Sequence, residues 1–99
     1  MIERNRRPTP PGEILKAHYL ETRGLTITRF AELTKLSRKH VSGIVNARPG
    51  VRITAETAVR FAKVLGTTGR FWMNLQNAVD LYDEQRKLAR WKPAEVSAA

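Results

Sequence analysis

Apolar residues recur at helical spacing through the first third of the chain. A first helix is predicted between Pro11 and Gly24, with Leu15 and Tyr19 on the same face. Thr26 is a good N-cap for a second helix, which we expect to end near Lys35. The inward positions predicted for the second helix are Ile27, Phe30, Ala31, Leu33 and Thr34.

The same spacing continues through the rest of the chain. Ser37 is placed to cap a third helix, which the breaker residues 46–50 end. Thr54 caps a fourth helix, and Thr67 or Thr68 opens a longer fifth one. The predicted apolar positions are Val41, Ile44 and Val45 in the third helix, Ala58, Phe61, Ala62 and Leu65 in the fourth, and Phe71, Trp72, Leu75, Val79 and Tyr82 in the fifth. No window shows the apolar alternation that a strand needs, so we predict an all-α fold of five helices with an extended last helix.

Three parts of the chain differ in pattern. Residues 1–10 are polar, basic and without periodicity, so we predict a mobile N-terminal segment. Its arginines suit a phosphate-binding arm, a protein contact or a solubilising tail, and they are Arg4, Arg6 and Arg7. Residues 11–83 form the predicted domain, and residues 84–99 the end of the last helix and a frayed tail. The acidic residues of the last helix are expected to form a solvated face, and they are Asp80, Asp83 and Glu84.

Charge narrows the choice of partner. The chain of 99 residues has 18 Lys and Arg against 9 Asp and Glu, for a formal net charge of +9 and an isoelectric point near 10.9. Between residues 29 and 52, Glu32 is the only acid. The basic residues in that stretch are Arg29, Lys35, Arg38, Lys39, Arg48 and Arg52. This imbalance favours a polyanionic partner, with nucleic acid ahead of an anionic membrane.

Composition also excludes several kinds of site. Without cysteine, the chain has no disulfide, thiol nucleophile or Cys-ligated zinc, and two histidines cannot form a three-His metal site. The glycines form neither GxGxxG nor a Walker A loop, and the carboxylates are scattered. We therefore expect no catalytic site, no cofactor and no small-molecule ligand. No stretch resembles a signal peptide or a membrane span, so a cytoplasmic protein is expected.

A helix-turn-helix is predicted at about residues 27–46. The two short helices are joined only by Lys35-Leu36, and Ala31 lies where they would cross closely. In such a motif the outward N-terminal part of the second helix reads base edges in the major groove, where Arg and Lys can donate to guanine O6 and N7. The predicted base-reading residues are Ser37, Arg38, Lys39, Ser42 and Gly43. The predicted phosphate-binding residues are Thr28, His40, Asn46 and Arg48, with a merely solvated side chain as the alternative for His40.

Two other classes of protein were weighed against a DNA-binding protein. A small basic RNA-cleaving enzyme is expected to contain strands, which this pattern does not predict. A protein of the membrane surface needs a broad exposed apolar face, whereas each apolar stripe here is narrow enough for a core to cover. The long last helix alone has surplus apolar surface. We expect a second copy of the chain to cover it, through Phe71, Trp72, Leu75, Val79 and Tyr82.

The order of these motifs resembles that of the HigA antitoxins, a branch of the Xre/Cro-like helix-turn-helix family. The resemblance covers about residues 10–82. It rests on Pro11-Gly12-Glu13-Ile14-Leu15, Leu25-Thr26 through Val45-Asn46, Ile53-Thr54-Ala55-Glu56-Thr57-Ala58, Leu65-Gly66-Thr67, Phe71-Trp72-Met73-Asn74-Leu75-Gln76 and Asp80-Leu81. Lys35 and Ala47 stand where the family usually has glycine, so either Lys35 is strained or the turn is shaped differently.

The resemblance implies a function that the composition and spacing do not. It implies a homodimer that binds double-stranded operator DNA in its own promoter and represses its own operon. It further implies neutralisation of a HigB-like toxin, a RelE-like enzyme that cleaves messenger RNA. The alternative is a stand-alone Xre-family repressor without a toxin partner.

Overall fold

Four of the helices begin at a hydroxyl side chain that caps them. Each hydroxyl oxygen accepts a hydrogen bond from the backbone N–H three residues later, at distances of 3.0 to 3.3 Å. The caps are Thr26, Ser37, Thr54 and Thr68. The first three were predicted as caps, and Thr68 is the one of the two predicted candidates, Thr67 and Thr68, that caps α6. Such a cap contributes about 1 kcal/mol relative to alanine because it satisfies an N–H that the helix leaves unpaired. The sequence thus determines where these helices start.

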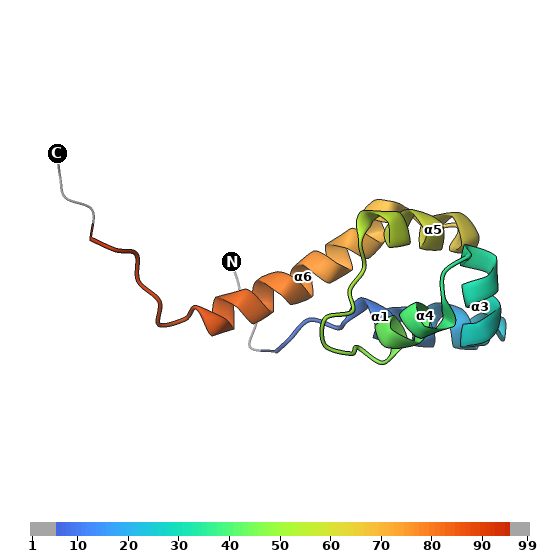
Figure 1. Ribbon diagram of the computed structural model, residues 1–99, viewed down its shortest axis with the longest axis horizontal. Helices are drawn as coiled ribbons and strands as arrows, with labels where there is room; N and C mark the ends of the chain where they lie inside the picture. The colour runs from blue at the N-terminus through green and yellow to red at the C-terminus, as the bar shows by residue number, and fades with distance from the viewer. Residues whose placement is uncertain (1–5, 96–99) are drawn as a thin grey trace.

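The computed structural model describes residues 6–95, in which five helical rods and no strands are found (Figure 1). The first rod is continuous and comprises α1 (Pro11–Ile14), the π-helical stretch η1 (Leu15–Leu20) and α2 (Glu21–Arg23). The others are α3 (Ile27–Thr34), α4 (Arg38–Val45), α5 (Ala55–Leu65) and α6 (Gly69–Lys87). The predicted all-α fold with a long last helix is confirmed. The predicted terminal segments are described only in part, because residues 1–5, with Arg4, and 96–99 lie outside the described residues.

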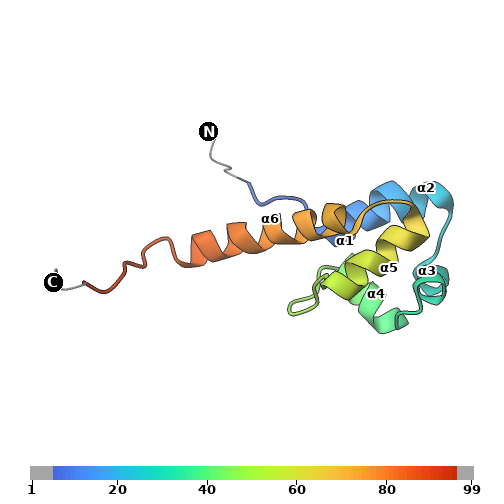
Figure 2. The same ribbon diagram turned by 90° about the horizontal axis from the view of Figure 1, so that it is seen from above.

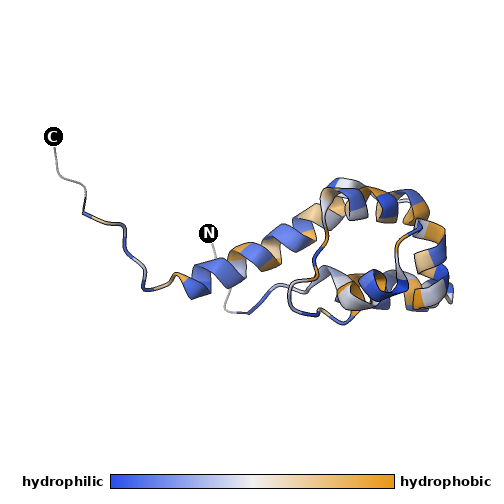
Figure 3. Ribbon diagram, viewed as in Figure 1, coloured by the Kyte–Doolittle hydropathy of each residue, from blue (hydrophilic) through white to orange (hydrophobic). Residues whose placement is uncertain are grey.

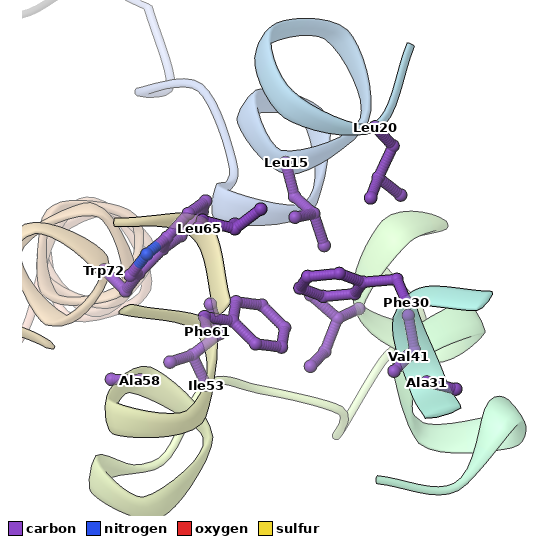
Figure 4. Close-up of a cluster of buried hydrophobic side chains, with 11 residues drawn as sticks. Leu15, Leu20, Phe30, Ala31, Val41, Ile53, Ala58, Phe61, Leu65 and Trp72 are labelled. Carbon is purple, nitrogen blue, oxygen red and sulfur yellow. The ribbon is translucent and has the colours of Figure 1, made fainter. Parts of the chain in front are cut away.

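Aromatic rings link the helices at the centre of the core (Figure 4). The ring of Phe61 in α5 lies 5.0 Å from that of Phe30 in α3 and 5.3 Å from that of Trp72 in α6, both edge to face. All three side chains are fully buried. The Trp72 indole N–H donates to Thr67 Oγ1 at 2.8 Å, so its polar atom is satisfied. Edge-to-face pairs add about 0.5–1.5 kcal/mol to the burial of their area, and this chain of rings therefore fixes α3, α5 and α6 to one another.

Gly12 lets the first rod approach α4 very closely. A Cβ atom added to Gly12 would lie 1.7 Å from the backbone oxygen of Ile44, which is less than any non-bonded contact allows. Both residues are buried. Only glycine fits between the two backbones, and the start of α1 is therefore locked against the end of α4.

The predicted core is largely confirmed, with one correction in α3. The apolar positions predicted for α5 are all buried, as are Val41 and Ile44 in α4. Leu33, however, is 41% exposed. Its neighbour Thr34 takes the inward position, where its hydroxyl donates to the carbonyl oxygen of Phe30 at 2.9 Å. Of the two neighbouring positions predicted to face inward, Thr34 is therefore confirmed and Leu33 is wrong.

The second half of α6 extends beyond the rest of the molecule (Figures 1 and 2). α6 begins against α5 and runs outward, so that the molecule measures 59 × 26 × 23 Å. Hydrophilic residues predominate along the projecting half (Figure 3). Of the helices in residues 6–95, none combines the length and apolar character that crossing a membrane requires.

Candidate nucleic-acid interface

α3 and α4 form a helix-turn-helix with a left-handed residue in its turn. Lys35 closes α3 with φ 59° and ψ 33°, a conformation that normally favours glycine. The next N–H, of Leu36, donates to the carbonyl oxygen of Ala31 at 3.1 Å and completes the turn. Ala31 is buried between the helices, as predicted. Of the two possibilities raised by the sequence, the structure therefore has the usual turn shape with a strained Lys35.

The first turn of α4 faces away from the core, at the end of the molecule opposite the tip of α6 (Figure 2). Ser37, Arg38 and Lys39 are exposed, and Ser42 is half-buried one turn later. Gly43 is wrongly predicted as base-reading. It is buried, because it faces Val51 of the following loop, whose side chain lies 2.9 Å from where a Cβ of residue 43 would be. Gly43 therefore provides space for that loop.

Two hydrogen bonds fix polar side chains of this surface. Arg38 donates from Nε to Oγ1 of Thr28, in the first turn of α3, at 2.9 Å. Asn46 donates from Nδ2 to the backbone oxygen of Ser42 at 2.9 Å and to its Oγ at 3.2 Å. Residues predicted separately as base-reading and phosphate-binding are thus paired with one another.

Of the residues predicted to bind phosphate, three are exposed and one is not. Thr28, Asn46 and Arg48 lie on the surface near the two ends of α4. His40 is half-buried, and its Nε2 lies 3.3 Å from Oγ1 of Thr57 in α5. The ring therefore joins α4 to α5, and the structure favours neither a phosphate contact nor the solvated alternative for His40.

Four cations of the basic stretch have no carboxylate partner among the described residues. Arg29 pairs with Glu32 at 3.2 Å, and Arg52 pairs with Asp80 of α6. The remaining cations are Lys35, Arg38, Lys39 and Arg48, all of which are exposed. An exposed surface with unpaired positive charge is what a phosphate backbone attracts.

Asp80 and Asp83 bind arginines, whereas the sequence suggested only a solvated face. The buried Gln76 accepts a hydrogen bond from the Ile53 N–H at 2.8 Å and donates to Asp80 at 3.0 Å, on the carboxylate that pairs with Arg52. Asp83 accepts two hydrogen bonds of 2.9 Å from Arg7. These hydrogen bonds lower the pKa of the Asp83 carboxyl and raise the pKa of Arg7. The predicted mobile N-terminal segment is therefore held at Arg7.

The residues predicted for a dimer interface do not lie on one surface. Trp72 and Val79 are buried within the chain, so neither is available to a second copy. Phe71 is 36% exposed, while Leu75 and Tyr82 are half-buried. These three residues lie on one flank of α6, because spacings of four and seven residues return to the same side of a helix.

Comparisons with known proteins agree with this geometry. The helix-turn-helix family model matches residues 15–72, which is more than half of the chain. YbaQ of Escherichia coli K12, named as an uncharacterised helix-turn-helix transcriptional regulator, is 43% identical over 88 residues, or 89% of this chain and 76% of YbaQ. Antitoxin HigA-1 of Vibrio cholerae is 40% identical over 87 residues, covering 88% of this chain and 80% of HigA-1.

A solved structure extends the similarity to a DNA complex. The Pseudomonas aeruginosa antitoxin HigA, solved with the higBA promoter, matches with a TM-score of 0.82 and 30% identity. The match covers 92% of this chain and 97% of that one. The matched family is one of helix-turn-helix DNA-binding regulators and is not an enzyme family. The chain belongs to the Xre-like helix-turn-helix family of DNA-binding regulators, in which its relatives include HigA antitoxins.

Proposed function

We propose that this protein is the antitoxin of a type II toxin–antitoxin pair. It binds operator DNA as a dimer, represses its own operon, and neutralises a HigB-like toxin of the RelE-like, messenger-RNA-cleaving kind. The observation that carries the DNA-binding half is the exposed first turn of α4, where Arg38 and Lys39 stand without a carboxylate partner among the described residues. The antitoxin half rests on the similarity to proteins named HigA.

Base reading is assigned to four of the five residues that the sequence predicted for it, namely Ser37, Arg38, Lys39 and Ser42. They occupy the face of the second helix that enters the major groove in a helix-turn-helix. Thr28 and Arg48 are assigned to phosphates, because they are exposed beside that face and have O–H or N–H groups to donate. Asn46 remains a proposed phosphate contact, which requires its Nδ2 to leave Ser42.

A homodimer is proposed through the flank of α6 formed by Phe71, Leu75 and Tyr82. The Phe71 ring lies 6.4 Å from that of Tyr19, so the flank is supported from beneath by the first rod. A two-fold contact would cover this apolar strip and place two copies of α4 about one DNA turn, or 34 Å, apart. Sedimentation at micromolar concentration should give a dimer. Leu75→Lys should give a folded monomer, whereas Asn77→Lys, at an exposed position on the far side of α6 from Leu75, should leave the dimer intact.

The test of the whole function uses the wild-type chain and the DNA upstream of its own gene. Anisotropy titrations should show much tighter binding to that duplex than to a scrambled duplex of equal length. Co-expression with the neighbouring open reading frame should restore growth if that frame encodes the toxin. Operator binding without any growth effect would instead favour a stand-alone Xre-family repressor. Equal affinity for the two duplexes would contradict both functions.

A further inference from the structure

We infer that Thr28 positions the Arg38 guanidinium to read a guanine with its two terminal nitrogens. This inference rests on the proposed operator binding and adds which base is read and which residue sets the geometry. Arg38 is the first residue of α4, and Thr28 lies in the first turn of α3. Both side chains are exposed at the end of the molecule where the two helices begin.

The hydrogen bond between these residues leaves one way for Arg38 to bind a base. A guanidinium can present either Nε with one terminal nitrogen or both terminal nitrogens to a pair of acceptors. In this protein Nε already donates to Thr28 Oγ1 at 2.9 Å. The remaining pair, Nη1 and Nη2, matches the O6 and N7 acceptors of guanine in the major groove.

The other side chains of α4 and its C-cap do not favour adenine or cytosine. Adenine is read by an amide that donates to N7 and accepts from N6, but the Asn46 Nδ2 is engaged by the backbone oxygen and Oγ of Ser42. Cytosine is read by a carboxylate, and α4 has none. The Ser42 oxygen accepts from Asn46, which leaves its hydroxyl hydrogen available as a donor. The reading surface therefore offers donors, and guanine presents two adjacent acceptors.

Thr28 can also contact a DNA phosphate while it holds Arg38. Its oxygen accepts from Arg38, so the hydroxyl hydrogen is available to a DNA phosphate. A phosphate contact at Thr28 would then fix the hydroxyl and, through it, the arginine that reads the adjacent base. Thr28 is a positioning residue, which distinguishes it from Arg38.

The experiment begins with sites selected from randomised duplexes about 30 base pairs long, which accommodate two half-sites one turn apart. The wild-type chain should enrich a guanine at one position of each half-site, and Arg38→Ala should lose the enrichment there alone. Replacing that guanine by 7-deazaguanine, which lacks N7 but keeps O6, removes one of the two acceptors and should weaken wild-type binding by about 5-fold or more, the lower end of the range expected for loss of a bidentate pair. The same replacement should hardly affect Arg38→Ala. Inosine, which keeps O6 and N7, is the matched control and should bind like guanine.

Thr28 is then tested by two variants of similar size. Thr28→Val removes the acceptor and should reduce the discrimination between guanine and 7-deazaguanine towards that of Arg38→Ala. Thr28→Ser retains the hydroxyl and should preserve the discrimination between guanine and 7-deazaguanine. Full discrimination in Thr28→Val, or an adenine at the Arg38-dependent position, would overturn the inference while leaving operator binding intact. Failure of the wild-type chain to select any sequence would overturn the proposed function itself.

Discussion

The helix-turn-helix and the long helix α6 are held by contacts of different range. In the helix-turn-helix, each cap joins residues three apart, the turn joins residues 31 and 36, and Arg38 bonds to Thr28 ten residues before it. In α6, three polar side chains bind distant partners: Gln76 bonds to Ile53, Asp80 to Arg52, and Asp83 to Arg7. The proposed reading surface is therefore built from residues close in sequence, whereas the placement of α6 depends on contacts with distant parts of the chain.

This difference separates two properties of a DNA-binding dimer. In the proposed function, base preference depends on side chains of α3 and α4, whose geometry is set by hydrogen bonds within these two helices. The separation of two reading helices depends on α6, through which the proposed dimer forms. Changes at the distant contacts of α6 should thus alter stability and assembly, and changes at α4 should alter sequence preference.

The largest effect on stability is expected at the contact between α1 and α4. Gly12→Ala places a methyl group 1.7 Å from the Ile44 oxygen, so the two helices must separate. We expect a loss of about 3 kcal/mol or more in the free energy of unfolding, measured by urea denaturation. Gly69→Ala is the control, because a Cβ there would meet Val59 at an ordinary 3.6 Å. Equal stability of the two variants would refute the close approach.

The next largest effect tests a distant contact of α6. Gln76→Met preserves the size of the side chain but removes the acceptor for the buried Ile53 N–H. An unsatisfied buried donor costs about 1–3 kcal/mol, so the free energy of unfolding should fall by that amount. Asn77→Met, at the exposed neighbouring position, should change it by no more than about 0.5 kcal/mol. An equal loss of unfolding free energy in both variants would show that the hydrogen bond between Gln76 and Ile53 does not stabilise the fold.

A smaller effect, of opposite sign, is expected in the turn. Lys35→Gly relieves about 1 kcal/mol of left-handed strain, and the greater freedom of glycine in the unfolded chain offsets part of the gain. We expect a slight rise in Tm at matched protein concentration. Lys63→Gly, in the last turn of α5, should instead lower stability by up to about 1 kcal/mol. A clear fall in Tm for Lys35→Gly would contradict the left-handed conformation.

The smallest effect concerns the exposed pair of Arg7 and Asp83. The hydrogen bonds from Arg7 lower the pKa of the Asp83 carboxyl, so folding favours the ionised form. The resulting stabilisation is present above the ordinary carboxyl pKa and is lost as the pH falls through the lowered value. An NMR titration of the Asp83 carboxyl should show its pKa return towards the ordinary value in Arg7→Ala and remain lowered in Arg6→Ala. No difference between these variants would show that the N-terminal segment is not held at Arg7.

The sequence predicted local features well and distant ones poorly. Caps, turn and buried stripes follow from residue type and spacing, whereas the unusual position of Lys35 was implied by the resemblance to the HigA antitoxins, which usually have glycine there. Gly43 was misassigned because spacing does not reveal that the loop folds back to place Val51 on it. Trp72 and Val79 were assigned to an interface because an apolar stripe has the same pattern whether its own chain or a partner covers it. The arginine partners of Asp80 and Asp83 lie 28 and 76 residues away, beyond the reach of any helical spacing.

The most direct test of the account compares sequence preference in three variants. Each is titrated against the operator and a scrambled duplex at two salt concentrations. Arg38→Ala and Lys39→Ala should each lose about 1–3 kcal/mol on the operator and little on the scrambled duplex, so the ratio of affinities should shrink. Arg6→Ala, in the N-terminal segment, should leave that ratio nearly unchanged. An unaltered ratio in both α4 variants would contradict the assignment of α4 as the reading helix.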